Sequence, residues 1–175
     1  MDKQQKEFLD AAFLSLTVRA TFGRSKTYRE GARKPDKARF KAALKEQLTE
    51  LAQQYTTGMD DDGHIKNIEH LADNLSTEFA QVLEGGRFRI GSAQKALNLY
   101  LKYLWCTKQI PMPPHCPFDN IIIGKLPGCN SINWTTLDSV EDYRRLVVTA
   151  RTEAGTVPLA QWELEAYNSA QVMVG

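Results

Sequence analysis

The chain has 175 residues, of which 42% are hydrophobic and 25% are charged, and its formal net charge is +1. This composition is that of an ordinary soluble globular protein able to bury a core. No run of 18 apolar residues occurs, which excludes a transmembrane helix, and the first ten residues, MDKQQKEFLD, lack the apolar centre of a signal peptide.

Three helices are predicted in the first half of the chain. Apolar residues recur at helical spacing over residues 3–20, 35–55 and 65–83. Residues 23–35 contain glycines and many basic residues and are predicted as a loop. Residues 56–63 break the chain with two glycines and three aspartates, and Gly85-Gly86 ends the third helix.

Four further helices are predicted in the second half. After a connector at residues 87–90, Ser92 is predicted to cap a helix that ends near residue 105. Residues 110–117 hold four prolines and cannot be regular. Short helix 119–126, loop 127–134 and helices 138–149 and 159–170 complete a single all-α domain of residues 1–175. A division into two lobes, about 1–84 and 85–175, with a cleft between them stays open.

A dense basic segment spans residues 19–45. Its ten basic and two acidic residues give it a formal charge of +8, so the remaining chain carries −7. A block of this kind suits a phosphate backbone. A solvated loop followed by an exposed helix face would have the same composition.

One lysine stands out within the apolar fourth helix. Gly91, Lys95, Asn98 and Lys102 follow one another at spacings of four, three and four, so they share one helical face. We expect Lys95 to be partly desolvated and close to the positive end of the helix dipole, and both effects disfavour the ammonium form. Lys95 is therefore a candidate amine nucleophile that could form a Schiff base with a sugar carbon.

The flanks of this helix suggest a phosphate and a carboxylate. The glycine turn before it would expose backbone amides to a phosphate, with Arg87 and Arg89 adding charge. Asp119 follows the proline run and opens the next predicted helix. It could act in catalysis, or it could simply cap that helix.

These residues resemble those of the helix-hairpin-helix DNA glycosylases. The stretch Ile90-Gly91-Ser92-Ala93-Gln94-Lys95-Ala96 is similar to the hairpin pattern G-x-G-x-K-T-A, and Pro117-Phe118-Asp119 to the P-V-D that supplies the catalytic aspartate. The run from Lys95 to Leu101 especially resembles the archaeal 8-oxoguanine glycosylase branch of that family. The resemblance covers about residues 83–126. It departs from the family where Arg89 replaces the first glycine, where Asn120 and Ile121 follow the aspartate, and where a C-terminal four-cysteine cluster is absent.

The resemblance implies a compact helix-hairpin-helix fold and a base-excision enzyme, a DNA glycosylase with or without lyase activity. Lys95 would attack the sugar C1′ of a flipped nucleotide while Asp119 stabilises the positive charge or relays the proton. The implied DNA contacts are Arg87, Arg89, Gly91, Ser92, Gln94, Asn98, Lys102, His115, Arg24, Lys26, Arg29, Arg33 and Lys34. Candidates for stacking on the base are Tyr103, Trp105, Phe118 and Trp134, although core packing would explain each of them.

The remaining expectations concern metal, partners and compartment. Cys106, His115, Cys116 and Cys129 lack the paired spacing of a zinc site, so we expect no metal and no cofactor. An odd number of unpaired cysteines indicates a cytoplasmic protein. His64 and His70 are expected at the surface, and the helix at 159–170 is expected to serve packing alone. The resemblance implies DNA as the partner, and we expect no membrane contact and a monomer. A non-catalytic nucleic-acid-binding module and a protein-interaction domain stay open as alternatives.

Overall fold

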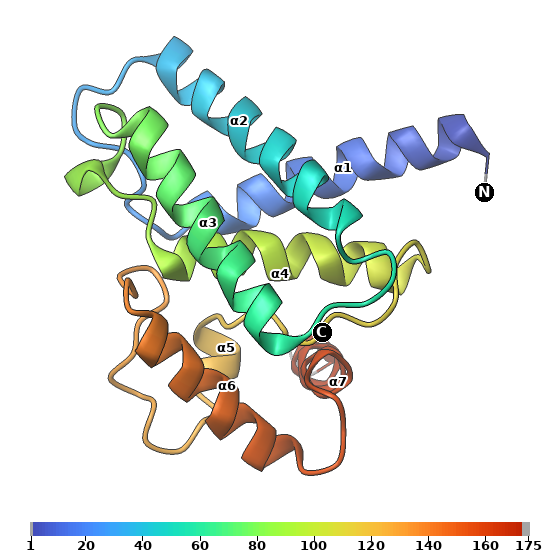
Figure 1. The fold of residues 1–175 in the computed structure, drawn as a ribbon. Coiled ribbons are helices and arrows are strands. Elements are labelled where there is room, and N and C mark those ends of the chain that lie inside the picture. The colour runs from blue at the N-terminus through green and yellow to red at the C-terminus, as the bar shows by residue number, and fades with distance from the viewer. Residues whose placement is uncertain (1, 173–175) are drawn as a thin grey trace.

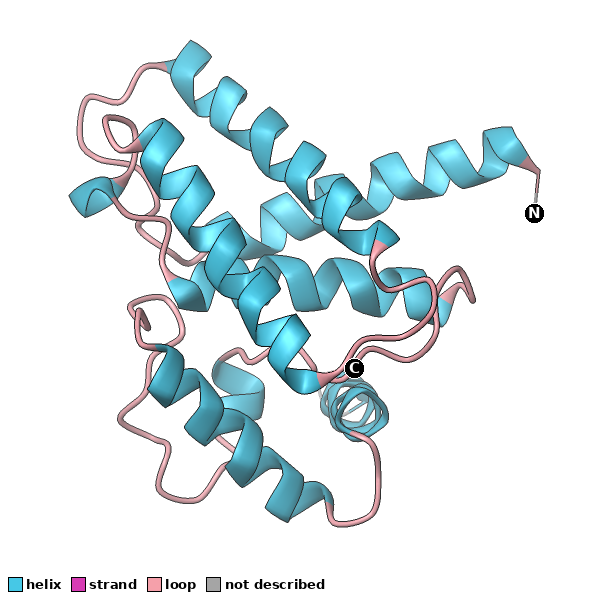
Figure 2. Ribbon diagram, viewed as in Figure 1, coloured by secondary structure: helices cyan, strands magenta, loops and turns pink. Residues whose placement is uncertain are grey.

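Residues 2–172, which a computed structural model describes, form seven α-helices and one short 3-10 turn (Figures 1 and 2). The all-α prediction is confirmed, because no strand occurs in this part of the chain. An isolated antiparallel bridge joins Tyr28 to Leu83 and ties the basic loop to the turn after the third helix. No helix among these residues is long and apolar enough to cross a membrane.

The first three helices are α1 (Lys3–Phe22), α2 (Lys34–Gln53) and α3 (Asp61–Phe79). A capping box between Asp2 and Gln5 starts α1. Helix α3 starts four residues before the predicted boundary, because the Asp60 side chain accepts from the Gly63 amide and caps it. The 3-10 turn Glu84–Gly86 follows, with Gly85 at φ 61° and Gly86 at φ 70°.

Helix α4 (Ile90–Cys106) lies in the middle of the fold and packs against α1 and α3 (Figure 1). Thirteen of its residues are buried, and Ala93, Ala96, Leu97 and Leu101 have no exposed surface. Phe40 of α2 is equally buried and packs edge-on against Phe79 and Phe88. One apolar core therefore joins residues from both sides of position 84, where the division into lobes was left open.

The predicted start of α4 was wrong. The helix begins at Ile90, and Ser92 lies inside it. Arg89 occupies the capping position without a side-chain bond. The first amides are satisfied from a distant segment instead: Ile90 N–H donates to Asp138 Oδ1 at 3.0 Å and Gly91 N–H donates to the Leu137 carbonyl at 2.8 Å.

Three helices complete the chain: α5 (Asn120–Ile123), α6 (Val140–Ala154) and α7 (Leu159–Val172). Helix α5 is one turn long, shorter than predicted, because the next amides, those of Lys125 and Leu126, donate to the Ile122 and Ile123 carbonyls three residues back, as in a 3-10 turn. Ser139 caps α6 through the Asp142 amide. Helices α5 and α7 pack together, and α6 packs on α7 and on α4.

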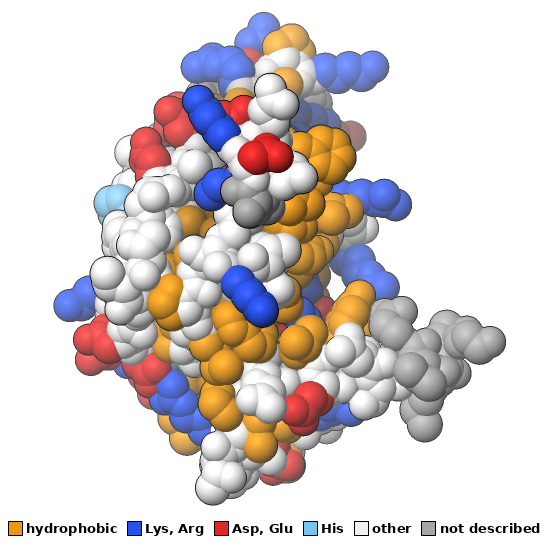
Figure 3. All heavy atoms as spheres, turned by 90° about the vertical axis from the view of Figure 1, so that its right-hand side faces the viewer, with side chains coloured by type: hydrophobic (Ala, Val, Ile, Leu, Met, Phe, Trp, Pro, Cys, Tyr) orange, Lys and Arg blue, Asp and Glu red, His pale blue; other side chains and the backbone are white. Residues whose placement is uncertain are grey.

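The surface carries separate apolar and basic regions. Figure 3 shows apolar side chains gathered on the side of the molecule where the N-terminal end of α1 and the C-terminal end of α4 lie. Phe8 and Leu16 of α1 are 73% and 47% exposed. Lysine and arginine side chains project at the top of the same view, where α2 begins (Figure 3).

Two histidines are buried in the interior, and for His64 this overturns the expectation of a surface position. His64 Nδ1 lies 2.7 Å from the Tyr55 hydroxyl and His115 Nδ1 lies 2.8 Å from the Tyr143 hydroxyl. The two imidazole rings pack edge to face, with their centres 4.6 Å apart. Burial lowers the pKa of His115 to about 4, against an opposing effect of Asp61, and burial together with His115 lowers the pKa of His64 well below its usual value.

The fold should therefore lose stability in mild acid. Both histidines stay neutral in the folded protein, whereas the unfolded chain takes up protons as the pH falls below about 6.5. Between pH 6.5 and 4, His115 alone should cost about 3 kcal/mol of unfolding free energy. Urea unfolding at pH 7.5 and 4.5 measures this loss. His115→Gln should reduce the difference, whereas His70→Gln, at an exposed histidine, should keep it; an equal loss in both variants would contradict this assignment.

Candidate active site on the polar face of α4

A pocket of about 380 Å³ opens beside α4. It is lined from α1, α4, the residues around α5, and α7, so its walls come from both sides of residue 84. Its charged and aromatic lining residues are Arg24, Lys95, Lys102, Tyr103, Asp119, Trp134, Glu163 and Tyr167. Its volume falls within the range of small-molecule sites, about 300–1,000 Å³.

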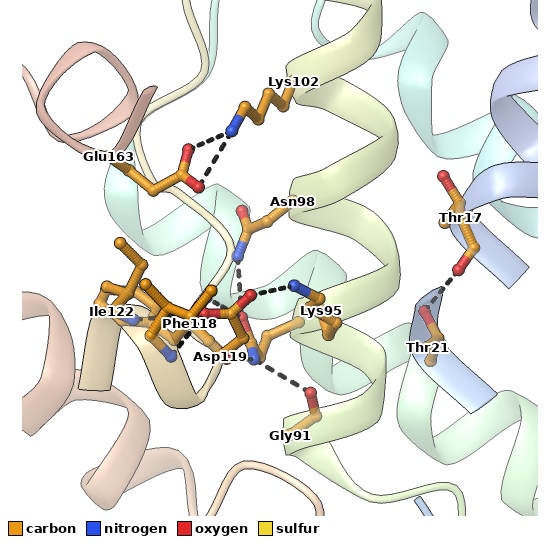
Figure 4. A network of polar contacts seen from close by, with 12 residues as sticks. Thr17, Thr21, Gly91, Lys95, Asn98, Lys102, Phe118, Asp119, Ile122 and Glu163 are labelled. Carbon is orange, nitrogen blue, oxygen red and sulfur yellow. Dashed lines mark hydrogen bonds and ion pairs between the residues drawn. The ribbon is translucent and has the colours of Figure 1, made fainter. Parts of the chain in front are cut away.

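The two residues singled out from the sequence meet in this pocket. Lys95 Nζ lies 2.7 Å from Asp119 Oδ2, and the side chains are 9% and 23% exposed (Figure 4). Lys95 comes from the second turn of α4, because this helix starts two residues earlier than the predicted cap. Its ammonium is therefore further from the helix end than expected, and the Asp119 carboxylate stabilises it.

Asp119 has two roles that the sequence left as alternatives. Its Oδ1 accepts from the Ile121 and Ile122 amides at 3.0 and 3.2 Å, so it caps α5. Its Oδ2 faces Lys95. One carboxylate oxygen is thus fixed to the backbone, which leaves the other aimed at the amine inside the pocket.

A second ion pair, between Lys102 and Glu163, lines the same pocket. Lys102 Nζ is 3.0 and 2.7 Å from the two carboxylate oxygens of Glu163, whose side chain is 5% exposed (Figure 4). The same ammonium lies 4.5 Å from the centre of the Tyr167 ring. Burial raises the pKa of the Glu163 carboxyl, and the Lys102 ammonium opposes that rise.

Sequence reasoning missed Glu163 and Tyr167. Both lie on α7, which was expected to serve packing alone. They are four residues apart and so share one face of α7. The sequence did hold a signal for Glu163, because this acid interrupts the apolar pattern of Leu159, Ala160 and Trp162, and an acid in such a place needs a partner if it is buried.

The turn before α4, which was predicted to bind a phosphate, is closed: its backbone amides are bonded to other parts of the chain. The Ile90 and Gly91 amides already have acceptors at residues 137–138. A Cβ atom on Gly91 would overlap the Trp134 carbonyl oxygen and lie 2.8 Å from its carbon. Gly91 is therefore required for the approach of the chain's own backbone, and its amide has no free direction for a phosphate.

Other residues of this predicted DNA contact are also buried. Ser92 is 5% exposed, and Gln94, Asn98 and His115 have no exposed surface. This leaves no surface for the phosphate contacts predicted at these positions. Gln94 and Asn98 bond to each other and to neighbouring backbone or hydroxyl groups instead.

The predicted cations divide into paired and unpaired groups. Lys26 pairs with Glu84, and Arg33 with Asp36. Arg87 pairs with both Asp73 and Asp138, while Arg89 approaches the Thr135 carbonyl. Within residues 2–172 no carboxylate pairs with the exposed residues Arg19, Arg24, Arg29, Lys34, Arg39 and Lys41.

Of the four residues predicted to stack on a base, two line the pocket and two do not. Tyr103 and Trp134 line the pocket, and Tyr103 stacks on Phe13 of α1 with ring centres 5.1 Å apart. Phe118 is fully buried in the core, and Trp105 is half-buried outside the pocket lining. Within the described part of the chain, no group of three or more His, Cys, Asp or Glu side chains is placed to hold a metal ion.

The fold and site define an all-α protein with a lysine–carboxylate pair inside a pocket. No protein-family model, no curated protein and no solved structure matches this chain.

Proposed function

We propose that this protein is a DNA base-excision enzyme, a glycosylase with lyase activity of the helix-hairpin-helix kind. One observation carries the proposal: an amine and a carboxylate, distant in the sequence, contact each other within a pocket of about 380 Å³. A nucleotide flipped out of the duplex would bring its sugar to this pair. Tyr103 and Tyr167 offer aromatic surface to its base, whereas Trp134, at 2% exposure, is buried behind the pocket wall.

The reaction follows from the pair. Asp119 takes a proton from the Lys95 ammonium, and the freed nitrogen lone pair forms a bond to C1′. The bond from C1′ to the base breaks, and its electron pair leaves with the base. Asp119 passes the proton taken from Lys95 to the departing base, so its carboxylate is restored and stabilises the positive charge on the sugar. The nitrogen then loses a second proton, which moves to O4′ as the C1′–O4′ bond breaks, and the nitrogen lone pair forms the C=N bond of a protonated Schiff base.

Borohydride trapping tests this proposal. The protein is incubated with duplexes that each hold one damaged or mismatched base, and borohydride reduces any Schiff base to a stable covalent adduct. We expect an adduct with at least one duplex and none with an unmodified duplex. Salt-dependent binding without an adduct on any duplex would instead favour a non-catalytic nucleic-acid-binding module. Absence of both would favour a protein-interaction domain.

The basic surface supports DNA as the partner. Lys34, Lys41 and Lys45 are spaced seven and four residues apart on one face of α2, and Lys45 Nζ reaches Ser15 Oγ of α1 at 3.3 Å. Arg19 lies one turn beyond Ser15, and Arg24 reaches the pocket. With the turn before α4 closed, we propose that phosphates bind along this surface of α1 and α2.

Removing three of these charges should weaken DNA binding in a salt-dependent way. The triple variant Arg19→Gln, Lys34→Gln, Lys41→Gln should lower the slope of log K against log salt by roughly 3, since each phosphate contact contributes about 0.9. Fluorescence anisotropy at several salt concentrations measures the slope. The matched triple variant Lys66→Gln, Lys108→Gln, Lys125→Gln removes the same charge from exposed lysines elsewhere and should leave it unchanged. Equal slopes in both triple variants would refute this surface.

A further inference from the structure

Gln94 joins α4 to the segment that carries Asp119. Its Nε2 donates to the Phe118 carbonyl at 2.7 Å, and its Oε1 accepts from the Phe118 amide at 3.1 Å. The side chain has no exposed surface. A single carboxamide thus occupies both backbone groups of one residue, as a neighbouring β-strand would.

The positions of these two residues in the sequence give the bond its significance. Gln94 immediately precedes Lys95, and Phe118 immediately precedes Asp119. The side-chain bond therefore joins the two backbones one residue away from the amine–carboxylate pair. The segment before Phe118 is irregular and contains Pro113, Pro114 and Pro117, so no helix or sheet fixes its backbone.

The carboxamide is itself held from three sides. Its Nε2 also donates to the Gly91 carbonyl at 3.0 Å, and its Oε1 accepts from Asn98 Nδ2 at 3.3 Å. Asn98 in turn donates to the Tyr143 hydroxyl of α6 at 3.2 Å. These bonds fix which end of the amide faces the Phe118 carbonyl and which faces its N–H.

We propose that Gln94 is a positioning residue that holds the Asp119 carboxylate against the Lys95 amine. The Gln94–Phe118 bonds place Asp119 in the folded protein whether or not it is an enzyme, whereas their consequence for catalysis rests on the proposed glycosylase function. Because a displacement of about 1 Å in a reacting group can cost about 100-fold in rate, loss of this bond should slow Schiff-base formation far more than it weakens DNA binding.

The first experiment compares two buried variants. Gln94→Met keeps the size of the side chain and removes both bonds to Phe118. Tyr143→Phe removes a hydroxyl from the same network and keeps the Gln94–Phe118 bonds. In single-turnover borohydride trapping we expect a loss of about 100-fold for Gln94→Met and less than about 5-fold for Tyr143→Phe. Equal losses in the two variants would overturn the proposal.

A second readout does not depend on activity. Lys95 and Lys102 lie on one face of the same helix, and each is ion-paired, but only the partner of Lys95 follows Phe118. Brief acetylation followed by mass spectrometry gives the ratio of labelling at the two lysines. Gln94→Met should raise the Lys95/Lys102 ratio at least about 5-fold, because Asp119 no longer covers the amine, and Tyr143→Phe should leave it unchanged. An unchanged ratio in Gln94→Met would also overturn the proposal.

The acid variant provides a rescue. In Gln94→Glu, the protonated carboxyl can donate to the Phe118 carbonyl and accept from its N–H, whereas the ionised form faces that carbonyl with a negative charge. Trapping relative to the unchanged protein at the same pH should rise at least about 10-fold between pH 8.5 and 5.5. A ratio that is constant with pH would contradict the positioning role. If the unchanged protein forms no adduct at all, the glycosylase function fails, and the labelling ratio alone decides the role of Gln94.

Discussion

Replacing Lys95 by glutamine should abolish the borohydride adduct, with a loss of at least about 10³-fold in the trapping rate. Glutamine has no amine that can form a Schiff base. The other lysine that lines the pocket, Lys102, is bonded to Glu163 and not to Asp119. Quantification of the adduct on a denaturing gel measures the loss. Retained trapping would move the nucleophile to another amine.

The folded state of this variant should survive. Asp119 loses its cation but keeps the Ile121 and Ile122 amides and remains partly solvated, so we expect a cost of about 2 kcal/mol, below that of breaking a fully buried pair. Circular dichroism checks the fold. Lys108→Gln, at an exposed lysine after the same helix, should trap normally.

Asp119→Asn removes the carboxylate of the pair and keeps the Lys95 amine, so it tests the two groups separately. The asparagine oxygen can still cap α5, but the side chain no longer takes a proton from Lys95 or balances its charge. We expect the adduct to form about 10²- to 10³-fold more slowly and still to depend on Lys95.

Replacing Gly91 by alanine should strongly destabilise the fold. The added Cβ would overlap the Trp134 carbonyl and approach the Leu137 Cβ at 3.0 Å. Because the obstacle is backbone, no change of rotamer relieves it, and residues 134–137 have to move away from α4. That movement breaks the Gly91–Leu137 bond and disturbs the Ile90–Asp138 bond that starts the helix.

We expect Gly91→Ala to cost about 3 kcal/mol or more, and hence to lower Tm by about 6–12 °C for a chain of this size. Thermal unfolding followed by circular dichroism measures the shift. Ser92→Ala changes the next buried residue without adding an atom and should stay within about 0.5 kcal/mol. A stable Gly91→Ala variant would mean that the space beside α4 is open, as a phosphate seat would require.

The helices could be predicted because their signals are local. Phe40, Leu44, Leu48 and Leu51 recur every three or four residues and are all buried. The starts of helices were less predictable. Asp60 caps α3, and an aspartate three residues before a glycine amide is a local signal for that start. The start of α4 could not be predicted locally, since its amides bond to residues 137–138, far along the chain.

The candidate site was predicted in part. Lys95 and Asp119 were chosen from the sequence, and they meet. Gln94 and Asn98 were grouped with the DNA contacts because they share a helix with Lys95, yet both are buried. Gln94 is covered by Phe118 and Asn98 by Tyr143, and helical spacing carries no information about which distant residues cover a face.

By itself, the sequence determined the helical class of this protein, the concentration of positive charge at residues 19–45, and the presence of one lysine and one carboxylate in an apolar setting. These properties depend on residue type and short-range periodicity. The tertiary structure alone decided that the turn before α4 is closed by Trp134 and Leu137, that Glu163 shares the pocket, and that Gln94 holds the Phe118 backbone. Each of these is a contact between residues at least 24 positions apart, and such contacts depend on how the helices pack together.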